Sequence, residues 1–115
     1  MKKILIVEHS PAITESLDET LRRKHTIFVC RGDCLFAAIE SIRPDALIVD
    51  ISLIGIEGLL KLRDAANKPP ILLIVTNILT EQLLLAAEEV GGDYIARFPF
   101  SSDALSQRLD DLLSK

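Results

Sequence analysis

Short apolar runs alternate with amphipathic stretches along the whole of this 115-residue sequence, and that alternation limits the folds open to it. The runs are rich in Val, Ile and Leu on consecutive positions, which is typical of strands buried on both faces. Between the runs, apolar residues recur every three or four positions, as they do on one side of a helix. Strands that alternate with helices form a parallel sheet covered on both faces. The sequence therefore predicts a single α/β domain over residues 1–115.

Start and stop signals mark the predicted helices. Ser10 and Pro11 suit the start of the first helix, Pro44 stops the second, and the glycines at 91–92 close the fourth. A loop containing Gly55 is expected between the third strand and the third helix. The predicted strands are 4–7, 26–30, 46–49, 71–75 and 94–96, and the apolar helix stripes span 13–21, 35–42, 59–66, 81–90 and 105–113.

The composition excludes several classes of partner. The net charge of -4 and the pI near 5.1 argue against nucleic acid and anionic membranes as direct partners. No apolar run approaches the roughly 20 residues that span a bilayer. Cys30 and Cys34 follow no metal-binding spacing and are expected to be reduced thiols, and His25 is expected to be a loop residue. We therefore expect a cytoplasmic globular protein.

Polar side chains follow three of the predicted strands. Glu8 and His9 come after the first strand, Asp50 ends the third, and Thr76 ends the fourth. The carboxyl ends of these strands meet at one edge of a doubly wound sheet, where ligands bind. Carboxylates grouped there could hold a hard divalent cation that neutralises a phosphoryl group. The Thr76 hydroxyl could then donate a hydrogen bond to a phosphoryl oxygen.

An ordered series of motifs over nearly the whole chain resembles a response-regulator receiver domain of two-component signalling. The resemblance implies a flavodoxin-like, doubly wound, five-stranded parallel sheet of order 2-1-3-4-5 with five helices. The motifs are Lys3-Ile4-Leu5-Ile6-Val7-Glu8, Pro44-Asp45-Ala46-Leu47-Ile48-Val49-Asp50, Gly58, Ile74-Val75-Thr76, Gly91-Gly92-Asp93-Tyr94-Ile95 and Pro99-Phe100.

The resemblance also implies roles for individual residues. Asp50 stands at the position of the family's phosphoacceptor, and Thr76 at that of the residue which tracks the phosphoryl group. Glu8, Asp50 and the backbone carbonyl of Ser52 would hold Mg²⁺. His9 stands where the family has a second acid, and a neutral imidazole is a poor Mg²⁺ ligand. We therefore expect weak Mg²⁺ affinity, and a metal-ligand role for His9 itself is doubtful.

The family's lysine, which precedes a cis-proline, is missing as well. Alignment on Pro99-Phe100 puts Phe98 at the lysine position and needs no gap, whereas alignment on the preceding strand puts Arg97 there. We favour Phe98, and we expect that the peptide bond before Pro99 is cis. An arginine is not equivalent to the point charge of a lysine.

Three consecutive leucines on the fourth predicted helix indicate a contact surface. Leu83, Leu84 and Leu85 span about 200° of arc, so they cannot all face the sheet. At least one points to solvent or to a partner. We expect a homodimer through the fourth helix, the fifth strand and the fifth helix, the face that such families use for dimers.

These features predict a stand-alone receiver domain without an output domain, working in a bacterial-type phosphorelay. Asp50 would accept a phosphoryl group from a sensor histidine kinase, a phosphotransfer protein or a small phosphodonor. The protein would be a phosphoacceptor for signalling and not an enzyme in the ordinary sense. The alternative is a pseudo-receiver that binds partners without phosphorylation. A flavin-binding role is disfavoured by the absence of Trp, the single Tyr and the lack of a phosphate-binding loop after the first strand.

Overall fold

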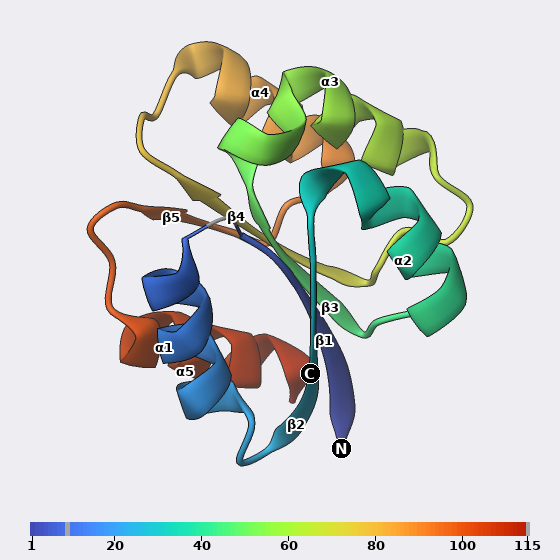
Figure 1. Ribbon diagram of the computed structural model, residues 1–115. Coiled ribbons are helices and arrows are strands. Elements are labelled where there is room, and N and C mark those ends of the chain that lie inside the picture. The colour runs from blue at the N-terminus through green and yellow to red at the C-terminus, as the bar shows by residue number, and fades with distance from the viewer. Residues whose placement is uncertain (9, 115) are drawn as a thin grey trace.

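The structure, a computed structural model, describes residues 1–8 and 10–114. Within them, five strands form one parallel sheet in the order β2-β1-β3-β4-β5, so the predicted fold and strand order are confirmed (Figure 1). The strands are β1 (Lys2–Val7), β2 (His25–Cys30), β3 (Ala46–Asp50), β4 (Ile71–Thr76) and β5 (Tyr94–Arg97). The helices are α1 (Pro11–Leu21), the 3₁₀ turn η1 (Gly32–Cys34), α2 (Leu35–Ile42), α3 (Ile51–Asp64), α4 (Glu81–Val90) and α5 (Ser102–Leu113).

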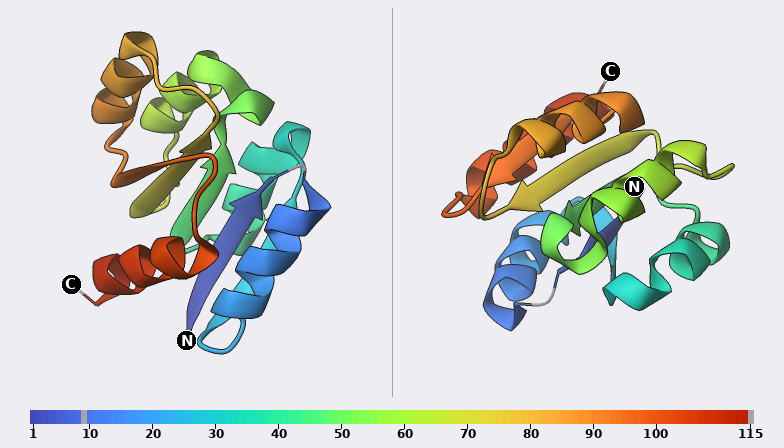
Figure 2. Two further views of the ribbon diagram at one scale, coloured as in Figure 1. Left: turned by 90° about the vertical axis from the view of Figure 1, so that its left-hand side faces the viewer. Right: turned by 90° about the horizontal axis from the view of Figure 1, so that it is seen from above.

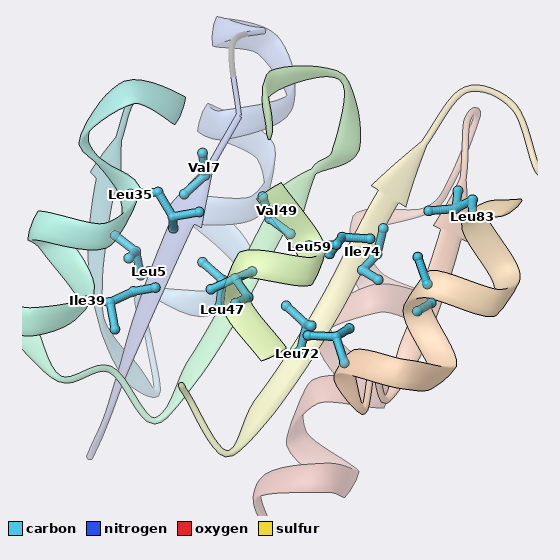
Figure 3. Close-up of a cluster of buried hydrophobic side chains, with 14 residues drawn as sticks. Leu5, Val7, Leu35, Ile39, Leu47, Val49, Leu59, Leu72, Ile74 and Leu83 are labelled. Atoms are coloured by element: carbon cyan, nitrogen blue, oxygen red, sulfur yellow. The ribbon is translucent and has the colours of Figure 1, made fainter. Parts of the chain in front are cut away.

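Helices cover both faces of the sheet. Helices α1 and α5 pack on one face, and α2, α3 and α4 pack on the other (Figures 1 and 2). Along β1, Leu5 and Val7 join the core under α2, α3 and α4, which Figure 3 shows, whereas Ile4 and Ile6 join the core under α1 and α5. Burial on both faces explains why the strands read as continuous apolar runs.

Side-chain caps begin helices α4 and α5. Thr80 Oγ1 accepts a hydrogen bond from Leu83 N at 3.1 Å, and Ser101 Oγ accepts one from Ala104 N at 3.2 Å. Gly91 follows α4 with φ of 76°, the left-handed conformation that ends many helices. Each side-chain cap contributes about 1 kcal/mol to stability.

The third helix departs from the prediction at both ends. Helix α3 begins at Ile51, directly after β3, so the expected loop is a helical turn. Gly55 interrupts the helix with φ of 68° and ψ of 176°, a conformation open to glycine because it has no Cβ. The helix then ends at Asp64, so Ala66 lies outside it. The helix starts early because the Asp50 side chain caps its first turn. In the sequence, Gly55 alone indicates a loop at this place.

The loop expected at His25 is also wrong, because His25 is the first residue of β2 and pairs with Lys2. Its largely buried imidazole donates through Nε2 to Asp110 Oδ1 at 2.9 Å, and Lys24 Nζ lies 3.2 Å from Asp110 Oδ2. Burial acts to raise the pKa of the Asp110 carboxyl. The hydrogen bonds and charges of His25 and Lys24 outweigh burial, so this pKa lies below its ordinary value of 3.8. These contacts fasten the edge strand β2 to α5.

Asp110→Asn is expected to lower the free energy of unfolding at pH 7 by about 1 to 2 kcal/mol, because charge-assisted hydrogen bonds weaken. The pKa of Asp110 is depressed by folding, so its stabilisation is complete above the unfolded pKa and is lost as the pH falls through the folded one. Thermal melts at pH 7 and pH 3 should show the difference from wild type shrinking in acid. Asp111→Asn, the same charge change on an exposed neighbour, is the control, and an equal effect of both variants would contradict this account.

Candidate functional site

The candidate site lies at the edge of the sheet where β1, β3 and β4 end. Val7 of β1 pairs with Val49 of β3, so the following residues, Glu8 and Asp50, hold equivalent places on neighbouring strands. Asp50 in turn pairs with Val75 of β4, the residue before Thr76. The strand register therefore brings the three described polar residues to one edge, as the sequence predicts.

Asp50 is buried, with 3% of its surface exposed, and it is the N-cap of α3. Its Oδ1 accepts hydrogen bonds from Ser52 N at 2.9 Å and from Ser52 Oγ at 2.8 Å. The carboxylate therefore lies at the positive end of the first turn of α3, where negative charge is favoured. The two bonds hold the side chain in one orientation at the strand end.

Glu8 is the second buried acid, with 7% of its surface exposed. Its Oε1 accepts a hydrogen bond from Ser10 N at 3.1 Å, just before α1 begins. His9, the doubtful metal ligand of the sequence interpretation, lies outside the described residues. A charged group is stable in a protein interior only when it is hydrogen-bonded, paired with an opposite charge or bound to a cation. Two buried carboxylates at one edge of the sheet are therefore typical of a functional site.

Thr76 is buried at the end of β4 and is bonded to the segment that leads into α4. Its hydroxyl donates to the carbonyl oxygen of Ile78 at 2.8 Å, and Ile78 N lies 3.2 Å from the same hydroxyl oxygen. Phe98 N donates to Thr76 O at 2.9 Å on the other side. The Thr76 side chain is therefore a direct link between the site and the chain before α4.

The oxygen donors at this edge suit a hard cation. Glu8 and Asp50 supply two carboxylates, and Ser52 lies beside Asp50. Among the described residues, no group of three or more His, Cys, Asp or Glu could hold a metal ion. Oxygen donors with few charges fit Mg²⁺, which keeps several waters, better than they fit Zn²⁺. The sequence did not indicate a role for the Ser52 hydroxyl, because that role depends on the hydrogen bond from Ser52 Oγ to Asp50 Oδ1.

An aromatic residue follows β5 directly. Arg97 is exposed and pairs with Thr76, and the peptide bond between Phe98 and Pro99 is cis. The Phe98 ring lies 4.9 Å from the Phe100 ring and packs with the core under α1 and α5. The position directly before the cis-proline is thus occupied by an aromatic ring and not by a cation.

An apolar hollow of about 270 Å³ opens between the start of α1 and the segment before α5. Ser16 Oγ and Ser102 Oγ, 2.7 Å apart, join the two helices beneath it. The only sequence signal for this hollow was the pair of phenylalanines flanking Pro99. Its lining residues are Ala12, Ile13, Ser16, Phe98, Pro99, Phe100 and Ser102.

The three leucines of α4 do not share one environment. Leu83 is buried in the core, so its expected place at an interface is wrong, because it faces the sheet at its position on the helix. Leu84 and Leu85 are 49% and 57% exposed. The homodimer through α4, β5 and α5 stays a prediction. No helix in residues 1–8 and 10–114 is long and apolar enough to cross a membrane.

Comparison with known proteins finds similarity to response regulators. No protein-family model matches the chain. The DNA-binding response regulator MtrA of Mycolicibacterium smegmatis is 27% identical over 112 residues, which cover 94% of this chain and 49% of MtrA. The probable transcriptional regulatory protein TcrX of Mycobacterium tuberculosis is 29% identical over 117 residues, covering 97% of this chain and 50% of TcrX. This chain therefore spans about half the length of these curated relatives.

Solved structures match along nearly the whole chain. A response-regulator signal receiver domain from Bermanella marisrubri has a TM-score of 0.83 and 26% identity, with 96% of this chain and 97% of that one covered. A response regulator from Thermotoga maritima has a TM-score of 0.83 at 17% identity, with 100% and 99% covered. The second likeness concerns the fold alone, whereas the first extends to the sequence.

Proposed function

We propose that this chain, a response-regulator receiver domain by its fold and by its sequence similarity to response regulators, accepts a phosphoryl group on Asp50 and signals through protein contacts. The observation that carries the proposal is the position of Asp50, a buried carboxylate at the carboxyl end of β3 beside a second buried acid. Such paired, buried carboxylates at this edge of an α/β sheet are suited to phosphoryl chemistry.

In the proposed reaction, an oxygen of Asp50 attacks the phosphorus of a phosphohistidine or of a small phosphodonor. The bond from phosphorus to the donor's nitrogen or oxygen breaks with its electron pair, and the leaving group takes up a proton. The product is an acyl phosphate on Asp50, which water later hydrolyses to carboxylate and phosphate. The Ser52 hydroxyl, bonded to Asp50 Oδ1, positions the attacking carboxylate.

Glu8, Asp50 and the backbone carbonyl of Ser52 would hold the divalent ion that this chemistry requires. Mg²⁺ at that place supplies positive charge against the phosphoryl oxygens. The buried carboxylates of Glu8 and Asp50 support this assignment, because hard oxygen donors are the ligands that Mg²⁺ prefers. With His9 in place of a second acid, we expect the ion to bind weakly.

Thr76 would report the state of Asp50 to the surface. Its hydroxyl cannot both donate to a phosphoryl oxygen and keep its present bond to the Ile78 carbonyl, because a hydroxyl has one proton to donate. Rotation toward the phosphoryl group would release Ile78, which is 66% exposed, and the following Leu79. The segment before α4 is therefore the proposed output of the switch.

The phosphodonor protein would dock at the apolar hollow between α1 and α5. This hollow adjoins the site through Phe98, whose backbone is bonded to Thr76. An apolar surface with the aromatic rings of Phe98 and Phe100 suits a helix of a sensor histidine kinase or a phosphotransfer protein. Docking there would bring a phosphohistidine to the edge of the sheet.

The proposal is tested by incubating the protein with acetyl phosphate and Mg²⁺ and measuring its intact mass. Wild type should gain one phosphoryl group, and Asp50→Asn should gain none. Asparagine is the right replacement because it also caps helices well, so α3 keeps its start while the nucleophile is lost. An adduct of equal yield in both proteins would contradict the proposal. No adduct in wild type, with partner binding unchanged in Asp50→Asn, would favour the phosphorylation-independent pseudo-receiver.

A further inference from the structure

Four of the seven exposed large apolar side chains among the described residues lie close together in the sequence. Ile78, Leu79, Leu84 and Leu85 lie within eight consecutive positions at the start of α4, and each is at least 43% exposed. Isolated surface leucines are ordinary, but a contiguous apolar area marks a binding surface. This cluster lies outside the candidate phosphorylation site.

A groove runs beside the cluster between α3 and α4, which lie next to each other in Figures 1 and 2. It encloses about 390 Å³. Helix α4 lines it with every third and fourth residue, so one side of that helix faces it. The lining residues are Ile56 and Leu60 of α3 and Gln82, Leu85, Ala86 and Glu89 of α4.

The border of this groove carries negative charge along α4. The charged residues of α4 are Glu81, Glu88 and Glu89, and the helix has no Lys or Arg. On the α3 side, Arg63 Nη1 donates to Glu89 at 2.6 Å, and Arg63 also pairs with Asp64, so its charge is already balanced. Glu89 is thus paired with Arg63, whereas Glu81 and Glu88, four residues before and three residues after Leu85, carry the negative charge beside the exposed leucine.

We propose that the groove between α3 and α4 binds a basic amphipathic helix of another protein. Aliphatic side chains on one face of that helix would fill the hollow over Leu60, Leu85 and Ala86, and flanking Lys or Arg residues would meet the glutamates of α4. A second copy of this chain is disfavoured in this groove between α3 and α4, because two α4 helices in symmetric contact there would bring Glu81 and Glu88 against like charges. The groove can bind its partner whether or not Asp50 is phosphorylated.

The size of the groove sets the expected strength of binding. A hollow of this volume accepts only a few side chains, so the interface falls in the small, transient class, with dissociation constants on the order of micromolar. Its charge complementarity predicts that binding weakens with added salt. Ile78, bonded to Thr76 at 2.8 Å, lies just before α4, so the partner would bind next to the segment that Thr76 holds.

The test uses a synthetic helical peptide of about 14 residues, with Leu on one face and Lys elsewhere. A twin peptide carries Glu in place of every Lys. Binding to the whole chain is followed by fluorescence anisotropy of labelled peptide, and the contact surface by amide chemical-shift changes. Leu85→Ser removes an exposed leucine of the groove, and Val29→Ser is the matched control, because Val29 is 51% exposed on the edge strand β2.

The proposal predicts that the Lys peptide shifts amides of α3 and α4 and that its dissociation constant rises about tenfold in Leu85→Ser. Val29→Ser should bind like wild type, and the Glu twin should bind at least about tenfold more weakly. The proposal is overturned by equal binding of both peptides, by equal loss in both variants, or by shifts centred on other helices. It is also overturned if light scattering shows a dimer of this chain that Leu85→Ser dissociates.

Discussion

Replacing His9 by Asp is expected to tighten Mg²⁺ binding by at least about tenfold, which corresponds to about 1.4 kcal/mol. The substitution restores the second acid of the receiver pattern next to the buried Glu8. Two opposite unit charges about 4 Å apart attract each other by about 4 kcal/mol at an effective dielectric constant of 20. Desolvation of the new carboxylate offsets part of this attraction, so a tenfold gain in Mg²⁺ affinity is a modest expectation. Since His9 lies outside the described residues, this expectation rests on its place in the sequence.

Isothermal titration calorimetry with MgCl₂ measures the effect directly. The chain has no Trp and one Tyr, so intrinsic fluorescence is a poor reporter. His9→Asn is the control, because it offers a neutral oxygen in place of a charged one. We expect Mg²⁺ affinity to be highest for His9→Asp, lower for His9→Asn and lowest for wild type. An Asp variant that binds no more tightly than the Asn variant would contradict the electrostatic explanation.

The second large effect is expected at the end of β5, where Phe98→Lys should raise the initial rate of phosphorylation by acetyl phosphate about tenfold. A lysine there would supply the cation that stabilises charge on the transferring phosphoryl group. The same change should lower the free energy of unfolding by about 1 to 3 kcal/mol, because Phe98 packs with Phe100 and with the core under α1 and α5.

Phe98→Met separates the two effects, since it removes the ring without adding charge. It should lose stability without a faster reaction. Arg97→Ala tests the other register. If Arg97 already serves as the cation, its loss should slow phosphorylation sharply and Phe98→Lys should bring no gain. That result would contradict the assignment of Phe98 to the lysine position.

The sequence predicted the features that rest on local chemistry. Buried strands need continuous apolar runs, and helix ends need particular residues, so Ser10, Pro11 and Gly91 mark boundaries that the structure confirms. The position of Asp50 at the carboxyl edge followed from the alternation of strands and helices alone. The helical turn after Asp50 was missed, because Gly55 indicates a loop until the capping bond to Ser52 is known.

Other features depend on contacts that no local pattern contains. The bond between His25 and Asp110 joins residues 85 positions apart, which explains why His25 resembled a loop residue. Three consecutive leucines cannot reveal the rotation of α4, so the burial of Leu83 required the packed structure. The Phe98 ring likewise packs under α1 because of the register of β5 against β4.

Asp50 is the residue proposed to carry the phosphoryl group, and a chemical modification can locate that group directly. Reduction of an acyl phosphate with borohydride converts the aspartate to homoserine, and tandem mass spectrometry of the digested protein then locates the converted residue. After incubation with acetyl phosphate and Mg²⁺, homoserine is expected at position 50 and at no other acidic residue. An unconverted Asp50, or homoserine at another aspartate of the chain, would contradict the assignment.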